Sequence, residues 1–226
     1  MKRMRTQAGP WRDAGRIAAL AAVIGFLSGA ARADDGDPPG RVARLSETEG
    51  SVSLEPAGVD EWTTAQVNRP LTTGDRLWTS AGSRAELDLG AAVIRLGDNT
   101  GFSFFALDDR TAQMQLAAGT LIVEVRDLQP GDNYEIDTPN IALTLQQPGA
   151  YRVEASDADA TTVVRISEGA AEAAGGGETV AIGPQQSVRF TGTDTLTFAS
   201  SVLGTPDDLD NWSAARERQA QDSSSG

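Results

Sequence analysis

The chain has 226 residues, of which 19 are lysine or arginine and 32 are aspartate or glutamate, and it contains neither cysteine nor histidine. The two absences exclude Ser-His-Asp triads and Cys-His dyads, zinc fingers, cysteine-ligated iron–sulfur clusters and disulfide frameworks. Any chemistry would have to come from carboxylates, hydroxyls, arginine or tyrosine. The length and the 39% hydrophobic content predict one globular domain.

Residues 1–33 have the three parts of a secretory signal peptide. A basic start precedes an apolar run from Ile17 to Leu27, and Ala31-Arg32-Ala33 fits the small-residue cleavage pattern. The run is much shorter than the roughly 20 residues that a transmembrane helix needs. We therefore expect cleavage near Ala33, a periplasmic or secreted bacterial protein, and no stable membrane anchor after cleavage.

Removing this segment makes the chain more acidic. The remainder has 13 basic and 31 acidic residues, a formal charge of −18. Phosphate backbones and anionic lipid surfaces repel such a chain, so nucleic-acid binding is disfavoured. High solubility is the simplest meaning of the charge.

The next segments form a linker and a long strand-rich body. Residues 34–40 (DDGDPPG) have the composition of a flexible linker. From residue 41 to 200, apolar residues alternate with polar ones, as in Ala85, Leu87 and Leu89, with turn residues between short runs. The body is therefore predicted to be all-β, with many short strands in a β-solenoid-like or two-layer roll, or alternatively in a jelly-roll-like sandwich.

A weak internal repeat favours the roll over a Greek key. Glu49-Gly50 recurs as Glu168-Gly169, and Ala118-Gly119 begins a similar strand. Glycine at such positions can supply a bulge or a positive φ where the chain turns a corner.

The C-terminal region reads as a short helix and a tail. Thr205 would cap a helix over residues 205–220, with Pro206 in its first turn and acidic residues at the positive end of the helix dipole. Residues 221–226 are predicted to be a disordered tail.

Carboxylates are the remaining acid–base candidates, and they form three clusters. These clusters are Asp108/Asp109, Asp132/Glu135/Asp137 and Asp157/Asp159. The first and third lie in turn sequences, and neither matches a calcium-binding loop. Asp137-Thr138-Pro139 shares two letters with the aspartic protease motif but has no second copy. We expect no catalytic residues, no cofactor and no metal site.

Exposed aromatic residues are the best candidates for a binding face. The set comprises Trp62, Trp78, Phe105 and Trp212. Phe104 and Phe105 are adjacent, so within a strand one of the two must face outward.

A succession of motifs resembles the FecR domain over roughly residues 42 to 190. The motifs are Gly50–Ser53, Trp62, Leu71–Thr79, Ser83–Leu87, Ile94–Leu96, Leu116–Gly119, Tyr134–Pro139, Pro148–Val153 and Glu168-Gly169. The resemblance implies an extracytoplasmic all-β module, which in some relatives belongs to a sigma-factor regulator. Such regulators carry an N-terminal anti-sigma region, whereas only 16 residues precede Ile17, so we expect a stand-alone exported FecR-like protein.

Three functions remain open. The first is a non-catalytic module that binds an envelope protein or polysaccharide, in which Gly74-Asp75 and Asp137-Thr138-Pro139 are structural corner motifs. Their carboxylates would cap backbone amides, and the proline would end a strand. The second is a component of an extracytoplasmic signal relay without its own sigma-binding domain. The third is a carboxylate-dependent enzyme acting on envelope glycans, which requires two acidic groups close in space.

Overall fold

The structure is a computed structural model that describes residues 41–224. The predicted signal peptide and the predicted linker, residues 1–40, lie outside the described residues. No helix in the described range is long and apolar enough to cross a membrane.

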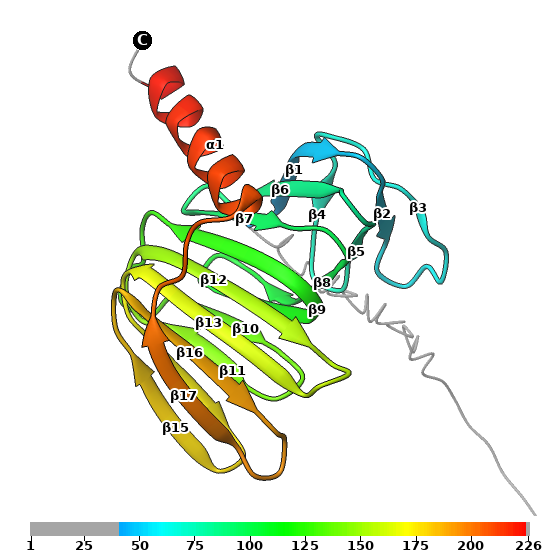
Figure 1. Cartoon of the computed structure of the whole chain (residues 1–226). Helices are drawn as coiled ribbons and strands as arrows, with labels where there is room; N and C mark the ends of the chain where they lie inside the picture. Colours follow the sequence, from blue (N-terminus) through cyan, green and yellow to red (C-terminus); the bar gives the residue numbers. More distant parts are fainter. Residues whose placement is uncertain (1–40, 225–226) are drawn as a thin grey trace, which may run out of the picture. The chain divides into compact units, whose positions relative to one another are not determined.

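The described chain consists of β-strands followed by one helix, which confirms the all-β prediction with a C-terminal α-helix (Figure 1). The strands of the first half are β1 (Ala43–Glu49), β2 (Val52–Glu55), β3 (Thr63–Thr64), β4 (Pro70–Leu71), β5 (Arg76–Thr79), β6 (Arg84–Asp88), β7 (Ala92–Leu96), β8 (Thr100–Leu107) and β9 (Thr111–Val125). Those of the second half are β10 (Asn133–Asp137), β11 (Ala142–Leu145), β12 (Gly149–Ser156), β13 (Thr161–Glu168), β14 (Ala171–Gly175), β15 (Glu178–Ile182), β16 (Gln186–Thr191) and β17 (Thr197–Val202). The helix is α1 (Asp208–Ser224).

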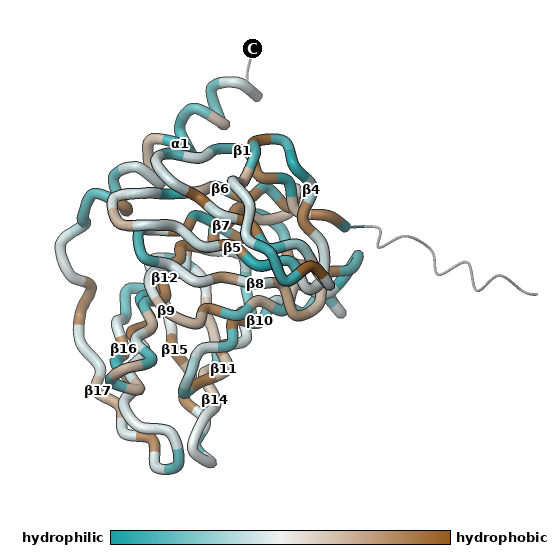
Figure 2. The backbone as a smooth tube through the Cα atoms, turned by 90° about the vertical axis from the view of Figure 1, so that its right-hand side faces the viewer, coloured by the Kyte–Doolittle hydropathy of each residue, from teal (hydrophilic) through white to brown (hydrophobic). Residues whose placement is uncertain are grey.

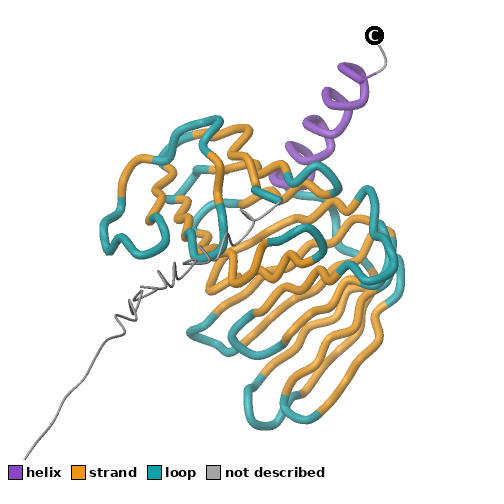
Figure 3. Tube along the Cα trace, turned by 180° about the vertical axis from the view of Figure 1, so that it is seen from behind, coloured by secondary structure: helices purple, strands orange, loops and turns teal. Residues whose placement is uncertain are grey.

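The strands form one open sheet that folds into two layers, as Figures 1 and 3 show. Layer A has the order β4-β1-β6-β7-β9-β12-β13-β16-β17. Layer B has the order β3-β2-β5-β8-β9-β10-β11-β14-β15. Apart from the parallel pair β9–β10, the pairings in both layers are antiparallel.

Strand β9 belongs to both layers. Its first half, through Ala118, pairs with β8 and β10, and its second half, from Gly119, pairs with β7 and β12. Gly119 adopts φ +95°, which a residue with a side chain rarely tolerates. A Cβ at this position would also overlap the backbone of Thr100. Glycine therefore lets β9 pass from layer B into layer A.

The repeated glycines of the sequence mark two further crossings between the layers. Gly50 lies between β1 in layer A and β2 in layer B, and Gly169 lies between β13 in layer A and β14 in layer B. Both have positive φ. The two copies of the repeat therefore lie at similar corners, where the chain passes from layer A to layer B.

The inward-facing side chains of both layers form a single apolar core. Fully buried members include Leu87 and Val164 from layer A and Leu77 and Ile136 from layer B. Figure 2 shows hydrophobic positions recurring along the strands, whereas α1 is mostly hydrophilic. The core therefore lies between the layers, and their outer faces are available for other contacts.

The helix begins later and ends later than the sequence predicts. Asp207 caps it, because its carboxylate accepts hydrogen bonds from the N–H groups of Leu209 and Asp210. The carboxylate of Asp210 in turn accepts the N–H of Asp207, which completes a reciprocal cap. The helix continues to Ser224, so residues 221–224, expected in a disordered tail, are helical.

Candidate functional site

Three of the four predicted binding aromatics lie on the outer face of layer B. Trp78 is outward on β5, where it pairs with Gly101 of β8. A Cβ at Gly101 would lie 3.5 Å from Cε3 and Cζ3 of Trp78, so the indole ring lies over the Gly101 backbone. The ring is supported on one side by the sheet and remains 40% exposed.

Trp62 lies beside β3 and is held by an arginine. The guanidinium of Arg76 is 5.6 Å from the Trp62 ring centroid, and it also forms an ion pair of 2.5 Å with Glu55. Trp62 is 44% exposed. A cation over one ring face and a carboxylate behind the cation limit the orientations that this ring can adopt.

Phe105 completes the group at an irregularity in β8. The register of β8 against β9 shifts between Phe104 and Ala106, and Phe105 is 57% exposed while Phe104 is buried. The adjacent phenylalanines therefore divide between the surface and the core, as the sequence requires.

We call Trp62, Trp78, Phe105 and Arg76 the aromatic face. Strand spacing and rise put the backbones of its three aromatic residues about 12 to 16 Å apart. The outward positions between the rings are small or uncharged polar residues, namely Ser53, Thr64, Gly101, Ser103 and Gln115. The sequence did not single out these polar residues or Arg76, because only strand register places them beside the rings.

Trp212, the fourth predicted aromatic, lies apart from the aromatic face. Its indole N–H donates a 2.8 Å hydrogen bond to Oε1 of Glu49. The guanidinium of Arg84 lies 5.5 Å from its ring centroid. Glu49 and Arg84 belong to β1 and β6, so Trp212 attaches α1 to layer A.

The Gly74-Asp75 motif forms a tight corner before β5. Gly74 has φ +89°, and the carboxylate of Asp75 accepts 2.8 Å hydrogen bonds from the N–H groups of Ala57 and Thr72. Asp75 is buried. Its carboxylate therefore ties together two loops that precede β5.

Replacing Asp75 with alanine should lower the free energy of unfolding by about 2 to 3 kcal/mol, because two partly buried backbone donors lose a charged acceptor. Thermal and urea melts measure this loss, and Asp98→Ala, at an exposed position, is the control. Equal melting of Asp75→Ala and wild type would show that this corner does not depend on the carboxylate.

The Asp137-Thr138-Pro139 motif ends β10 by a different arrangement. The hydroxyl of Thr138 accepts the N–H of Ile141, and the Asp137 carboxylate accepts a side-chain hydrogen bond from Gln113. Pro139 follows just beyond the strand end. Thr138, not Asp137, therefore bonds to the backbone of this turn.

The acidic clusters are mostly used within turns. Asp108 accepts the N–H groups of Arg110 and Thr111, Asp132 accepts the N–H of Gln129, and Asp159 accepts the hydroxyl of Ser156. Within residues 41–224, no group of three or more acidic side chains is placed to hold a metal ion.

One acidic pair lies on a strand instead of a turn. Glu135 and Asp137 point outward from β10, and both accept hydrogen bonds from the side-chain amide of Gln113, at 2.9 and 3.0 Å. Burial raises the pKa of Glu135, and the negative charge of Asp137 raises it further. These two acids of the predicted clusters therefore share one hydrogen-bond donor.

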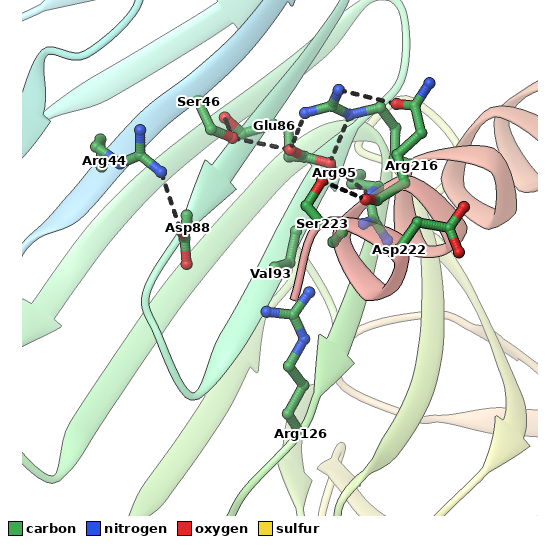
Figure 4. Close-up of a pocket in the computed structure, with 12 residues that line it drawn as sticks. Arg44, Ser46, Glu86, Asp88, Val93, Arg95, Arg126, Arg216, Asp222 and Ser223 are labelled. Carbon is green, nitrogen blue, oxygen red and sulfur yellow. Dashed lines mark hydrogen bonds and ion pairs between the residues drawn. The ribbon is translucent and has the colours of Figure 1, made fainter. Parts of the chain in front are cut away.

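A second polar cluster, which the sequence did not reveal, joins α1 to the outer face of layer A (Figure 4). Arg95 of β7 is 1% exposed, and its guanidinium donates to Glu86 at 2.9 Å, Ser213 at 2.9 Å and Glu217 at 3.3 Å. Arg216 of α1 completes the cluster with a 2.7 Å ion pair to Glu86. We call these five residues the helix clamp.

A cavity of about 600 Å³ lies beside the helix clamp and is lined mainly by charged residues. Those from the sheet include Arg44, Glu86, Asp88 and Arg95, and those from α1 include Arg216 and Asp222. Arg44 pairs with Asp88, and Arg95 and Arg216 pair with Glu86. The sheet carboxylates around this cavity are therefore already neutralised by arginines.

Arg152 provides a further attachment of α1. It forms ion pairs with Asp207 at 2.6 Å, Asp210 at 2.9 Å and Glu154 at 2.9 Å. The hydrogen bond from Arg152 holds the pKa of Asp207 well below its usual range. The start of the helix is thus fixed to β12 by charge.

The stability of the helix clamp should depend on pH through Glu86. Burial raises the pKa of this carboxyl, but hydrogen bonds from Arg216, Arg95 and Ser46 outweigh burial and lower it from 4.5 to about 2. A pKa lowered by folding gives stability that is present above the unfolded value and is lost as the pH falls towards the folded value.

The free energy of unfolding should therefore fall between about pH 4.5 and pH 2. Glu86→Gln should be less stable than wild type at pH 7, and the difference between the two should narrow across this interval. Urea unfolding at several pH values tests this expectation. A difference that stays constant with pH would contradict the role of the Glu86 charge.

Comparison with known proteins finds a family match for part of the β body. The family model "FecR protein" matches residues 75–172, which run from the start of β5 to β14. Two crystal structures of a "putative anti-sigma factor" from Parabacteroides distasonis ATCC 8503 are similar at 13% and 12% sequence identity, each with a TM-score of 0.49. Each match covers 56% of this chain and 59% of that chain, so the chain spans less than two thirds of the length of these structures. The comparison with curated proteins finds no match. The match lies within the region whose order of motifs resembles the FecR domain, and it confirms that resemblance for residues 75–172.

Proposed function

We propose that the chain is an exported, non-catalytic FecR-like β module that binds a protein or polysaccharide of the bacterial envelope. The observation that carries this proposal is the aromatic face, where three exposed rings share one side of a well-packed sheet. Exposed aromatics that the backbone holds in place lose little conformational entropy on binding and offer large contact areas. The signal-peptide pattern of residues 1–33 supports an envelope location.

The acidic residues support a non-catalytic role. Asp108, Asp132 and Asp159 are engaged in turns, and Glu135 and Asp137 share the amide of Gln113. Because the chain has no cysteine and no histidine, it lacks the residues that most often form a nucleophile and its general base. Binding is therefore the activity that this set of residues serves best.

A pull-down from solubilised envelope tests the proposal. The immobilised chain should retain a specific protein or glycan, and the double variant Trp62→Ala/Trp78→Ala should release it. Phe198→Ala is the matched control, because Phe198 is also a surface aromatic, 51% exposed, but lies on β17 in layer A. Retention that is unaffected by the double variant, or no retention by a folded chain, would refute binding through the aromatic face.

The family match favours a second candidate, a component of an extracytoplasmic signal relay. Family membership alone is a weak basis for function. This candidate predicts that a sigma factor co-purifies with the unprocessed chain. Purification without any sigma factor would leave only the envelope-binding proposal.

A further inference from the structure

The aromatic face is almost uncharged, although the chain beyond the signal peptide carries a net charge of −18. On the five strands from β3 to the first half of β9, the outward charged residues are Arg76 and Glu55, and they neutralise each other. The other outward positions are hydroxyl, amide, glycine, alanine and aromatic residues. Such a surface offers hydrogen bonds and ring contacts, and the outward carboxylates of Glu135 and Asp137 on the adjoining strand β10 disfavour an anionic ligand.

The support of the rings on one side restricts how a ligand can contact them. Trp78 packs against Gly101 and remains 40% exposed on its other side. Arg76 covers Trp62 on one side in a similar way. Ring faces are suited to stacking against flat or weakly polar faces of a ligand, which include the C–H faces of sugar rings.

The residues between the rings favour a partly polar partner. The strand register places small polar positions between the three aromatics. Ser53, Ser103 and Gln115 lie between them, and Ser103 donates a weak 3.4 Å hydrogen bond to Gln115. Protein partners usually bury a contiguous apolar centre. Separate ring contacts with polar groups between them match a chain of repeating units that bear hydroxyls.

We infer that the ligand of the aromatic face is an uncharged glycan chain, whose sugar rings stack on Trp78 and Trp62 and whose hydroxyls bond to the intervening polar side chains. This inference rests on the proposed function, because it concerns the same face. Arg76 would keep Trp62 in its stacking orientation.

Titration of the purified chain with defined oligosaccharides tests the inference. The probes are hexamers of N-acetylglucosamine and of β-linked glucose, followed by calorimetry and tryptophan fluorescence at 0.05 and 0.5 M salt. At least one hexamer should bind saturably, with little change between the two salt concentrations, because the ligand is neutral. Trp78→Ala should weaken binding about tenfold or more, whereas Phe198→Ala should not change it.

The outcomes separate this inference from the proposed function. If neither hexamer binds while the pull-down retains an envelope protein through the same face, the glycan inference is overturned and the proposed function stands. Hexamer binding that Trp78→Ala and Trp62→Ala leave unchanged would also overturn the inference. Thermal melts of each variant confirm that a loss of binding is not a loss of folding.

Discussion

Replacing Arg95 with methionine is expected to lower the free energy of unfolding by about 3 to 5 kcal/mol. Arg95 is buried under α1 and donates to Glu86, Ser213 and Glu217. Methionine would fill much of the same space but would leave Glu217 and the hydroxyl of Ser213 without this donor. Removing one partner from a buried ionic cluster exposes the full cost of desolvating the others.

The loss should be specific to the buried cluster. Arg44→Met is the control, because Arg44 forms its 3.1 Å ion pair with Asp88 at the surface. An exposed pair contributes about 1 kcal/mol or less. Urea unfolding compares the two variants, and hydrogen exchange of the α1 amides reports whether the helix detaches. Equal destabilisation by the two substitutions would refute the structural importance of the helix clamp.

Replacing Gly119 with valine is expected to cost about 3 kcal/mol or more, and it is the second large effect. Two penalties add at this position. The φ of +95° is strained for a residue with a side chain, and its Cβ would overlap the backbone of Thr100, which cannot move aside easily. Because β9 carries the chain from one layer to the other here, the strain would disturb pairings in both layers.

Gly58→Val separates the two penalties. Gly58 also has positive φ, at +73°, but a Cβ there would meet no atom within 4 Å. Gly58→Val should therefore lower the free energy of unfolding only through backbone strain, by about 1 to 2 kcal/mol. Thermal melts of both variants measure the difference. A similar loss at both positions would mean that the close contact with Thr100 is not important.

The strands and corners were predictable because they depend on local rules. Alternation such as Ala85, Leu87 and Leu89 is dictated by the two-residue period of a strand facing a core, and all three side chains are buried. The repeated Glu-Gly pairs at 49–50 and 168–169 signal a backbone conformation that glycine adopts most easily. Both patterns can be recognised in the sequence without knowing which strands pair.

The helix clamp was not predictable, since it depends on long-range placement. In the sequence, Arg95 stands between Ile94 and Leu96 and reads as a solvent-facing strand residue. It does face outward, but residues more than 100 positions later cover it. Trp212 was grouped with the binding aromatics for the same reason. Its contacts with Glu49 and Arg84 follow from the docking of α1, which no local pattern encodes.

The aromatic face was predictable only in part. Adjacent Phe104 and Phe105 had to divide between core and surface, but the register of β8 against β9 decides which one is outward. That Trp62 and Trp78 share a face depends on the pairing of β3, β2 and β5. The sequence supplied the residues, and strand order brought three of the four together.

Hydroxyl-radical footprinting of the chain, alone and with envelope extract, tests the aromatic face as the binding surface most directly. The account predicts that oxidation of Trp62, Trp78 and Phe105 decreases when the partner is added, while oxidation of Phe198 and Trp212 does not change. Protection confined to α1 or to β17, with no change at Trp62 and Trp78, would contradict it.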